Sequence, residues 1–227
     1  MSGKGVRWDR LRTSGIIGVT CVCGWLVMEL ELLGARILVP YFGSSVYVVM
    51  GSVIGVFLLS LASGYVLGGW LSSKRWSKGA LGANLIAAGA WLAVLPMFDE
   101  PVCEWISGLD VAETWGSLGA AFILFAVPTA LLGTVSPTAV RWLTREAENA
   151  GAKAGMVLGF STIASFAGTI ATAFYLVRLS VARTIVVSGV IAMGTGIAVL
   201  LDGGRKREEE QPLRREDTKA TRRRRGD

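Results

Sequence analysis

Long stretches without a charged residue recur along this chain and limit the folds that it can adopt. Each approaches the roughly 20 residues that an α-helix needs to cross the 30 Å hydrocarbon core of a bilayer. Hydrophobic residues make up 52% of the 227 residues, and the mean hydropathy is +0.52. The alternation over about ten residues that is typical of membrane β-strands does not occur. The sequence therefore predicts an all-α fold, a polytopic bundle of membrane helices.

Six apolar segments are separated by prolines, glycines and charged connections. We expect transmembrane helices over about Ser14–Leu38, Val46–Ser72, Ala80–Phe98, Gly116–Val135, Gly155–Val177 and Val181–Leu201. The chain then divides into a basic N-terminal segment (1–13), a six-helix domain (14–201) and a charged tail (202–227). The tail contains almost no apolar residue, so it cannot bury enough surface to fold alone and is predicted to be disordered.

The distribution of basic residues predicts the orientation of these helices. Lysine and arginine gather in the N-terminal segment, the Lys74–Lys78 loop, the Arg141–Lys153 loop and the tail, which all fall on one side. The connection Asp99–Trp115 falls on the other side and is acidic. By the positive-inside rule, both termini are cytoplasmic and the protein belongs to the cell membrane. Arg178 and Arg183 lie in an outer turn, where we expect them to reach the interface or the carboxylates of the first helix.

Several classes of chemistry find no support in the composition. The chain has no histidine, the commonest general base and zinc ligand. Its three cysteines, Cys21, Cys23 and Cys103, are interpreted as small apolar residues, so neither a metal site nor a cofactor is predicted. The net charge of +6 comes from segments beside membrane helices, where it sets topology or contacts anionic lipid. Membrane lipid is therefore the expected partner, and nucleic acid is not.

Three charges in the first helix are the most direct pointer to function. Glu29, Glu31 and Arg36 fall within eight positions of an apolar segment. A charge near the middle of a bilayer costs roughly 2.5–3.5 kcal/mol on insertion scales, so such residues usually mark a site. In a second interpretation Arg36 extends to the interface and neighbouring helices satisfy the carboxylates. The predicted solute-binding residues are Glu29, Glu31, Arg36, Tyr41, Tyr47 and Tyr65, with Glu31 foremost and no catalytic residue.

Small residues four positions apart occur in the second and fifth helices. Examples are Gly51 with Gly55, Gly64 with Gly68, and Gly155 with Gly159. Such spacing lets helix backbones approach closely. It predicts packing within the bundle and, as the alternative, a homo-oligomer through these two helices.

Two short motifs suggest an internal repeat. Leu32-Leu33-Gly34 precedes Pro40, and Leu131-Leu132-Gly133 precedes Pro137. With three helices per half, the halves would be inverted relative to each other, an arrangement common in transporters. Chance similarity between two such short motifs is the alternative. Pro40 and Gly43 are also expected to break the first helix.

The membrane part of the chain resembles the multi-pass domain of membrane-bound spermidine synthase-like proteins, described as fused transporter/spermidine synthases. The similarity covers roughly residues 24–201. It is carried by Leu30–Arg36, Val39–Val48, Gly64-Tyr65, Gly68-Gly69, Leu132–Pro137, Ser161-Thr162, Ser165, Gly168-Thr169 and Arg183-Thr184. The resemblance implies that architecture depends on Pro40, Gly43, Gly64, Gly68, Gly69, Pro137 and Gly168.

Three departures from the family pattern affect what the resemblance implies. Ser72-Ser73 stands where the family tends to have Ala-Asp, and Val49 where it often has Trp. The aminopropyltransferase domain that follows in the family has no counterpart after Leu201, so we expect no aminopropyl transfer by this chain alone.

The sequence thus favours a membrane protein that binds or transports a small solute. The resemblance implies a cationic, polyamine-like amine, for which Glu29 and Glu31 would supply negative charge and tyrosines cation–π faces. The alternative is a membrane anchor or regulatory subunit for a separately encoded soluble synthase. A membrane-embedded enzyme is the weakest hypothesis, since it would have to use carboxylates alone.

Overall fold

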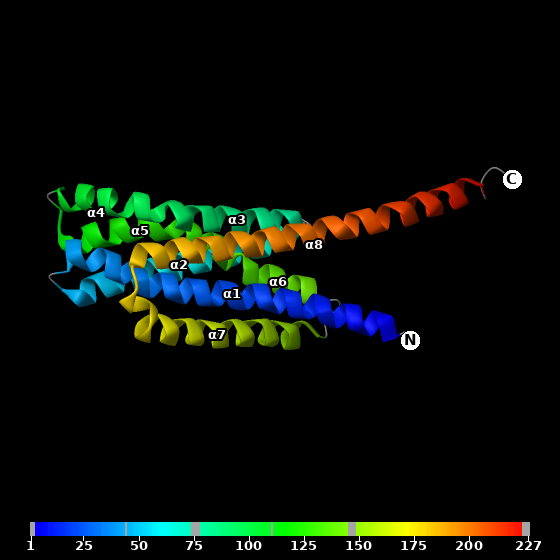
Figure 1. The fold of residues 1–227 in the computed structure, drawn as a ribbon, viewed down its shortest axis with the longest axis horizontal. Coiled ribbons are helices and arrows are strands. Elements are labelled where there is room, and N and C mark those ends of the chain that lie inside the picture. The colour runs from blue at the N-terminus through cyan, green and yellow to red at the C-terminus, as the bar shows by residue number, and fades with distance from the viewer. Residues whose placement is uncertain (1–2, 44, 74–77, 110, 145–148, 224–227) are drawn as a thin grey trace.

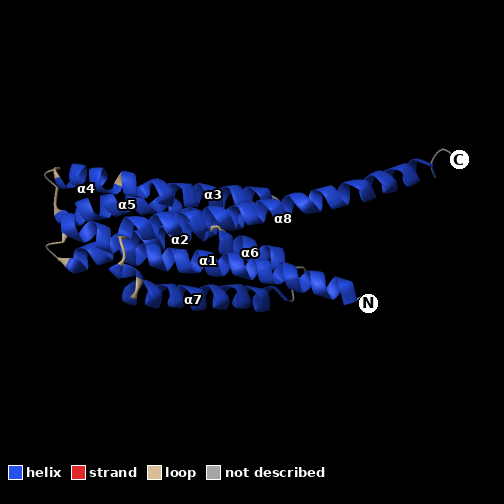
Figure 2. Ribbon diagram, in the orientation of Figure 1, coloured by secondary structure: helices blue, strands red, loops and turns tan. Residues whose placement is uncertain are grey.

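The computed structural model describes residues 3–43, 45–73, 78–109, 111–144 and 149–223, with side chains described between residues 13 and 202. These residues are almost entirely helical and contain no strand (Figures 1 and 2). The prediction of an all-α membrane bundle is confirmed. The basic N-terminal segment (1–12), the predicted basic loop at 74–78, residues 145–148 of the second basic loop and the tail from residue 203 lie outside the described side chains.

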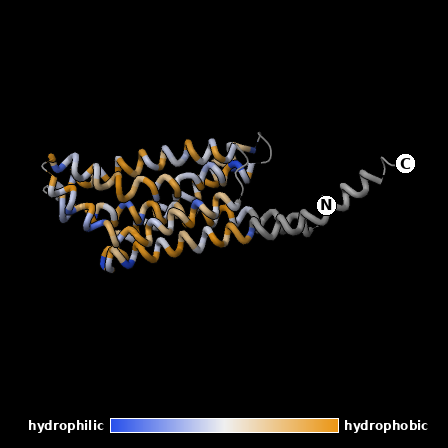
Figure 3. The backbone as a smooth tube through the Cα atoms, turned by 90° about the horizontal axis from the view of Figure 1, so that it is seen from above, coloured by the Kyte–Doolittle hydropathy of each residue, from blue (hydrophilic) through white to orange (hydrophobic). Residues whose placement is uncertain are grey.

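Eight α-helices and two short 3₁₀ helices make up the described chain. Their bounds are α1 Gly3–Phe42, α2 Val46–Ser73, α3 Lys78–Val94, η1 Leu95–Met97, α4 Asp99–Ser107, α5 Glu113–Gly133, α6 Val135–Leu143, α7 Ala150–Phe174, η3 Leu176–Arg178 and α8 Val181–Arg223. Apolar residues line the bundle along its length, and polar residues are more frequent at its ends (Figure 3).

Six helical segments are long and apolar enough to cross a membrane, as predicted. They are Thr13–Phe42, Val46–Ser73, Gly79–Met97, Glu113–Leu143, Ala150–Arg178 and Val181–Asp202. The start of α1 and the extension of α8 leave the bundle at the same end, as six crossings require (Figure 1). The assignment of this end to the cytoplasm stays a prediction from the basic loops.

Three close helix pairings organise the bundle. The second and fourth spans run parallel, with Gly64 against Ala130 and Gly68 against Thr134. The third and sixth spans, α3 and α8, run antiparallel. Their contacts are reciprocal: a Cβ on Gly89 would lie 2.5 Å from the Gly189 carbonyl oxygen, and one on Gly189 would lie 2.6 Å from that of Gly89.

The third pairing joins the first and fifth spans, α1 and α7, in parallel. Ser161 lies against Thr20 and Ser165 against Gly24, each pair separated by 141 positions. In a repeat of three helices, the first, second and third spans correspond to the fourth, fifth and sixth. If each span is replaced by its counterpart, the first–fifth pairing becomes the fourth–second pairing, and the third–sixth pairing is unchanged. This symmetry is the one expected of an inverted repeat, so the pairing supports that hypothesis.

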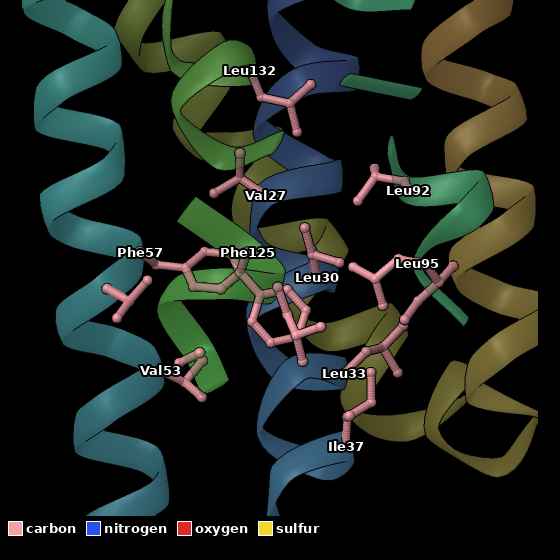
Figure 4. Close-up of a cluster of buried hydrophobic side chains, with 14 of the residues drawn as sticks. Val27, Leu30, Leu33, Ile37, Val53, Phe57, Leu92, Leu95, Phe125 and Leu132 are labelled. Carbon is pink, nitrogen blue, oxygen red and sulfur yellow. The ribbon is translucent and has the colours of Figure 1, made fainter. Parts of the chain in front are cut away.

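The apolar core lies where α1 passes between α2, α3 and α5. Figure 4 shows Leu30 and Leu33 of α1 beside Phe57 of α2, Leu95 of η1 and Phe125 of α5. The Phe57 and Phe125 rings are 5.7 Å apart between centroids. This core fixes α1 along one side and leaves its opposite side to α7 and α8.

The end of α1 differs from the prediction. Pro40 lies inside the last turn of the helix, which continues to Phe42, so the predicted break at Pro40 is wrong. Near a helix end proline removes only one hydrogen bond, the one that its missing N–H would have donated to the Arg36 carbonyl. Gly43 makes the turn, because a Cβ there would collide with the Val39 carbonyl oxygen.

The acidic connection and the fourth span contain more structure than predicted. Asp99 and Glu100 occupy the first turn of α4, where negative charge is favourable, and Cys103 and Ile106 are buried. The fourth span changes direction at Thr134, between α5 and α6.

Inside α5, Pro128 lacks the N–H that would bond to the Leu124 carbonyl oxygen. Trp91 of α3 donates its indole N–H to that oxygen at 3.0 Å. A side chain of the neighbouring span thus satisfies the backbone group that proline leaves open.

The structure continues α8 as a helix to Arg223, where the sequence predicted a disordered tail from residue 202. Figure 1 shows this end of α8 projecting from the bundle.

The predicted small-residue motifs divide into two groups. Gly64 and Gly68 pack against the backbone of α5 and its junction with α6, with Pro137 also beside Gly68. Gly168 packs against Trp25 of α1, where a Cβ would lie 2.9 Å from the backbone oxygen. The remaining predicted glycines have open space beside them within the chain: Gly51, Gly55, Gly69, Gly155 and Gly159.

Candidate functional site

A pocket of about 390 Å³ opens between α1, the η3 turn and the first turns of α8. This volume is within the range of small-molecule sites. Most of the surface is apolar, and a few polar groups converge on it. The lining residues are Trp25, Glu29, Leu176, Leu179, Ser180, Arg183, Thr184, Val187, Ser188 and Ile191.

Glu29 is the buried charge-bearing group of this pocket, with only 3% of its surface exposed. The Trp25 indole N–H donates to one carboxyl oxygen at 2.8 Å. Trp25 and Glu29 are four residues apart, so helical geometry places them on one face of α1. The Ser188 hydroxyl lies 2.5 Å from the other carboxyl oxygen and connects the site to α8.

The Ser188 hydroxyl can form its hydrogen bonds in two alternative arrangements, one for ionised and one for neutral Glu29. Its hydroxyl oxygen lies 2.5 Å from Glu29 and 3.0 Å from the Thr184 carbonyl oxygen, but a hydroxyl has one hydrogen to donate. An ionised Glu29 accepts that hydrogen. A neutral Glu29 donates its own proton to Ser188, which then donates to Thr184. Glu29 can therefore hold or release a proton without leaving a polar group unpaired.

Arg183 lines the same pocket from the first turn of α8. The sequence left two positions open for this arginine, the interface or the carboxylates of the first helix, and the structure brings it into one pocket with Glu29. No ion pair joins Arg183 to Glu29 within the described chain. The pocket therefore presents a carboxyl group and a guanidinium that do not neutralise each other directly.

Glu31 and Arg36 do not line this pocket. Glu31 is half-buried on another face of α1. Arg36 is exposed and donates to the carbonyl oxygen of Val177 in η3. Cationic side chains stabilise the ends of helices in this way, so Arg36 ties α1 to the end of the fifth span.

The tyrosines also lie apart from the pocket. Tyr47 and Tyr65 of α2 are 89% and 45% exposed. Tyr41 lies near the end of α1 and packs against the apolar core. Of the six predicted solute-binding residues, the structure brings only Glu29 into the pocket.

Sequence reasoning gave no role to Trp25 or Ser188. A signal for Trp25 exists in its spacing of four from Glu29. For Ser188 the sequence carries no such signal, since its position depends on how α8 packs against α1.

No protein-family model, no curated protein and no solved structure matches this chain.

Proposed function

We propose that this integral membrane protein binds and transports a small solute carrying an ammonium group, with Glu29 as its anionic partner. The observation that carries the proposal is a buried carboxyl group facing a pocket of about 390 Å³. Ionisable residues inside membrane spans typically mark substrate or ion pathways. Glu29 lies near the middle of its span, Thr13–Phe42.

The pocket chemistry suits an ammonium attached to an apolar body. A carboxylate has about four acceptor sites, and Trp25 and Ser188 use one each, so others are free for a ligand. The Trp25 ring lines the pocket beside Glu29 and adds a cation–π surface. Leucine, valine and isoleucine side chains cover the rest.

Arg183 limits how much positive charge the pocket can accept. A second ammonium would meet its guanidinium, whereas an anionic or polar group would be attracted to it. We therefore favour a solute with one ammonium and an anionic or polar second group over a fully charged polyamine. The polyamine implied by the family resemblance belongs in the test as a competing ligand.

Transport, rather than binding alone, is supported by the pairing of the helices. The two halves of the chain pair in the pattern of an inverted repeat, and such repeats commonly rock against each other around a site near the bilayer midplane. The two protonation forms of Glu29 would also let a proton exchange with the ammonium.

A thermal-shift series on the purified protein tests the binding proposal. The panel consists of a simple monoamine, spermidine and a zwitterionic amino acid of similar size. The zwitterion is expected to stabilise the wild type most, Glu29→Gln to remove all amine responses, and Arg183→Gln to remove the preference for the zwitterion. Amine stabilisation that survives in Glu29→Gln would overturn the proposal.

The extension of α8 favours a second candidate function. Beyond Asp202 the helix projects from the bundle for about 30 Å at 1.5 Å per residue. Such an arm suits the docking of a soluble synthase-like enzyme to the membrane. Co-sedimentation of that enzyme with vesicles, lost when Gly203–Asp227 is deleted, would support docking; unchanged co-sedimentation would exclude this arm as the docking site.

A further inference from the structure

The seam between α1 and α7 consists of small and hydroxyl-bearing residues in parallel register, and it adjoins the Glu29 pocket at Trp25. Ser161 lies 3.4 Å from the Thr20 carbonyl oxygen, and Ser165 donates to that of Gly24 at 3.0 Å. Arg36 donates to the Val177 carbonyl oxygen further along. Each pair is separated by 141 positions, so the register holds over this length.

That register places Thr172 opposite Glu31. Glu31 is seven residues after Gly24 and shares its helical face. Thr172 is seven residues after Ser165 and four after Gly168, the residue that packs against Trp25. Both residues therefore lie between two contacts of the seam, Gly24 with Ser165 and Arg36 with Val177.

Thr172 carries an unsatisfied hydroxyl at this position. Thr172 is 1% exposed, and none of the described residues forms a hydrogen bond with its hydroxyl oxygen. Other threonines of the same helix, Thr162 and Thr169, donate to the carbonyl oxygen four residues earlier. A buried hydroxyl without a hydrogen bond is unfavourable, and its oxygen is free to coordinate a cation.

Glu31 likewise lacks a hydrogen-bond partner among the described residues. Its carboxyl group is half-buried near the middle of the span Thr13–Phe42 and has no hydrogen-bond donor within the described chain. A carboxylate in this environment requires a cation or a proton. We propose that the α1–α7 seam binds one sodium ion between the Glu31 carboxylate and the Thr172 hydroxyl.

Charge balance selects a monovalent ion. Glu31 supplies one negative charge, so a divalent ion would leave a net positive charge in the membrane interior. The described residues also contain no group of three His, Cys, Asp or Glu side chains that could hold a transition metal. Carboxylate and hydroxyl oxygens are hard ligands, which suit sodium. The ion would clamp α7 to α1 between the Gly24–Ser165 and Arg36–Val177 contacts.

The test is the thermal stability of the full chain in detergent as potassium is replaced by sodium at constant ionic strength. Sodium is expected to raise the melting temperature of the wild type in a saturable manner. Glu31→Gln should abolish the response. Thr172→Val should weaken the apparent sodium affinity by about tenfold or more, while Thr172→Ser should retain it.

A matched control variant makes the result specific to this seam. Thr162→Val makes the same change on the same helix, at an exposed residue whose hydroxyl donates to the Leu158 carbonyl oxygen, and it should respond to sodium as the wild type does. A wild type that does not distinguish sodium from potassium, or a Glu31→Gln protein that keeps the full response, would overturn the proposal. For any variant of reduced thermal stability, equilibrium binding of radioactive sodium measures the affinity directly. Wild-type affinity in Glu31→Gln would then overturn the proposal.

Discussion

Replacing Gly189 by alanine tests the α3–α8 seam, which holds the two halves of the chain together. A Cβ on Gly189 would lie 2.6 Å from the Gly89 carbonyl oxygen and 2.7 Å from the Ala93 nitrogen. Ordinary contact begins near 3.4 Å, so the helices must separate locally by about 0.8 Å. Overpacking of this kind costs about 1–3 kcal/mol, and alanine recovers about 0.5–1 kcal/mol through its helix propensity. At the middle of these ranges the net loss is about 1 kcal/mol, and it can reach about 2.5 kcal/mol.

The matched control for this substitution is Gly194→Ala on the same helix. Nothing lies within 4 Å of the position where its Cβ would be, so alanine should be neutral or slightly stabilising. The free energy of unfolding, measured by titrating the folded protein with a denaturing detergent and following circular dichroism, should separate the two variants. If Gly189→Ala proves as stable as Gly194→Ala, the close approach of α3 and α8 is incorrect.

Three further predictions concern single contacts. Trp91→Phe should lower the free energy of unfolding by about 1 kcal/mol, because it leaves the Leu124 carbonyl oxygen unpaired. The loss should be smaller in a Pro128→Ala background, where residue 128 regains a backbone N–H. Equal losses in the two backgrounds of this double-mutant cycle would contradict the contact. Arg36→Met should lower the free energy of unfolding by about 1 kcal/mol and speed hydrogen exchange at the end of α7, with Arg36→Gln intermediate. Unchanged exchange would show that the hydrogen bond to Val177 contributes nothing. Burial raises the pKa of the Cys103 thiol to about 12, with a smaller contribution from Asp99. Because the pKa of the folded state exceeds the ordinary value of 9.0, the stability that this thiol contributes is complete below pH 9 and is lost as the pH rises toward 12. Maleimide should therefore label Cys103 only on unfolding at neutral pH, and rapid labelling of the folded protein would contradict its burial.

The membrane spans could be predicted because the bilayer imposes their length and composition. Each of the six predicted helices overlaps a span of the structure, and the errors lie at their ends. Pro40 illustrates the reason: a proline in the last turn removes one hydrogen bond, and the turn itself depends on Gly43. Helix α4 was missed because its nine residues are too few and too polar for the criteria that identify a span.

The candidate site could be predicted only in part. Glu29 was identified by its charge, which is a property of its own segment. Ser188, which forms a hydrogen bond with Glu29, and Arg183, which lines the same pocket, lie more than 150 residues away. No periodicity in the sequence specifies which face of α8 meets α1. For the same reason the sequence could not separate Glu29 from Glu31, which the structure places on different faces of α1.

The central claim is that Glu29 is the anionic partner of an ammonium solute. The direct measurement is equilibrium binding of a radioactive zwitterionic amine to the purified wild type, Glu29→Gln and Glu31→Gln, with excess unlabelled amine as the measure of non-specific binding. We expect Glu29→Gln to weaken binding by more than about tenfold, since it removes the ion pair, and Glu31→Gln to bind as the wild type does. Equal binding by the wild type and Glu29→Gln would contradict the account.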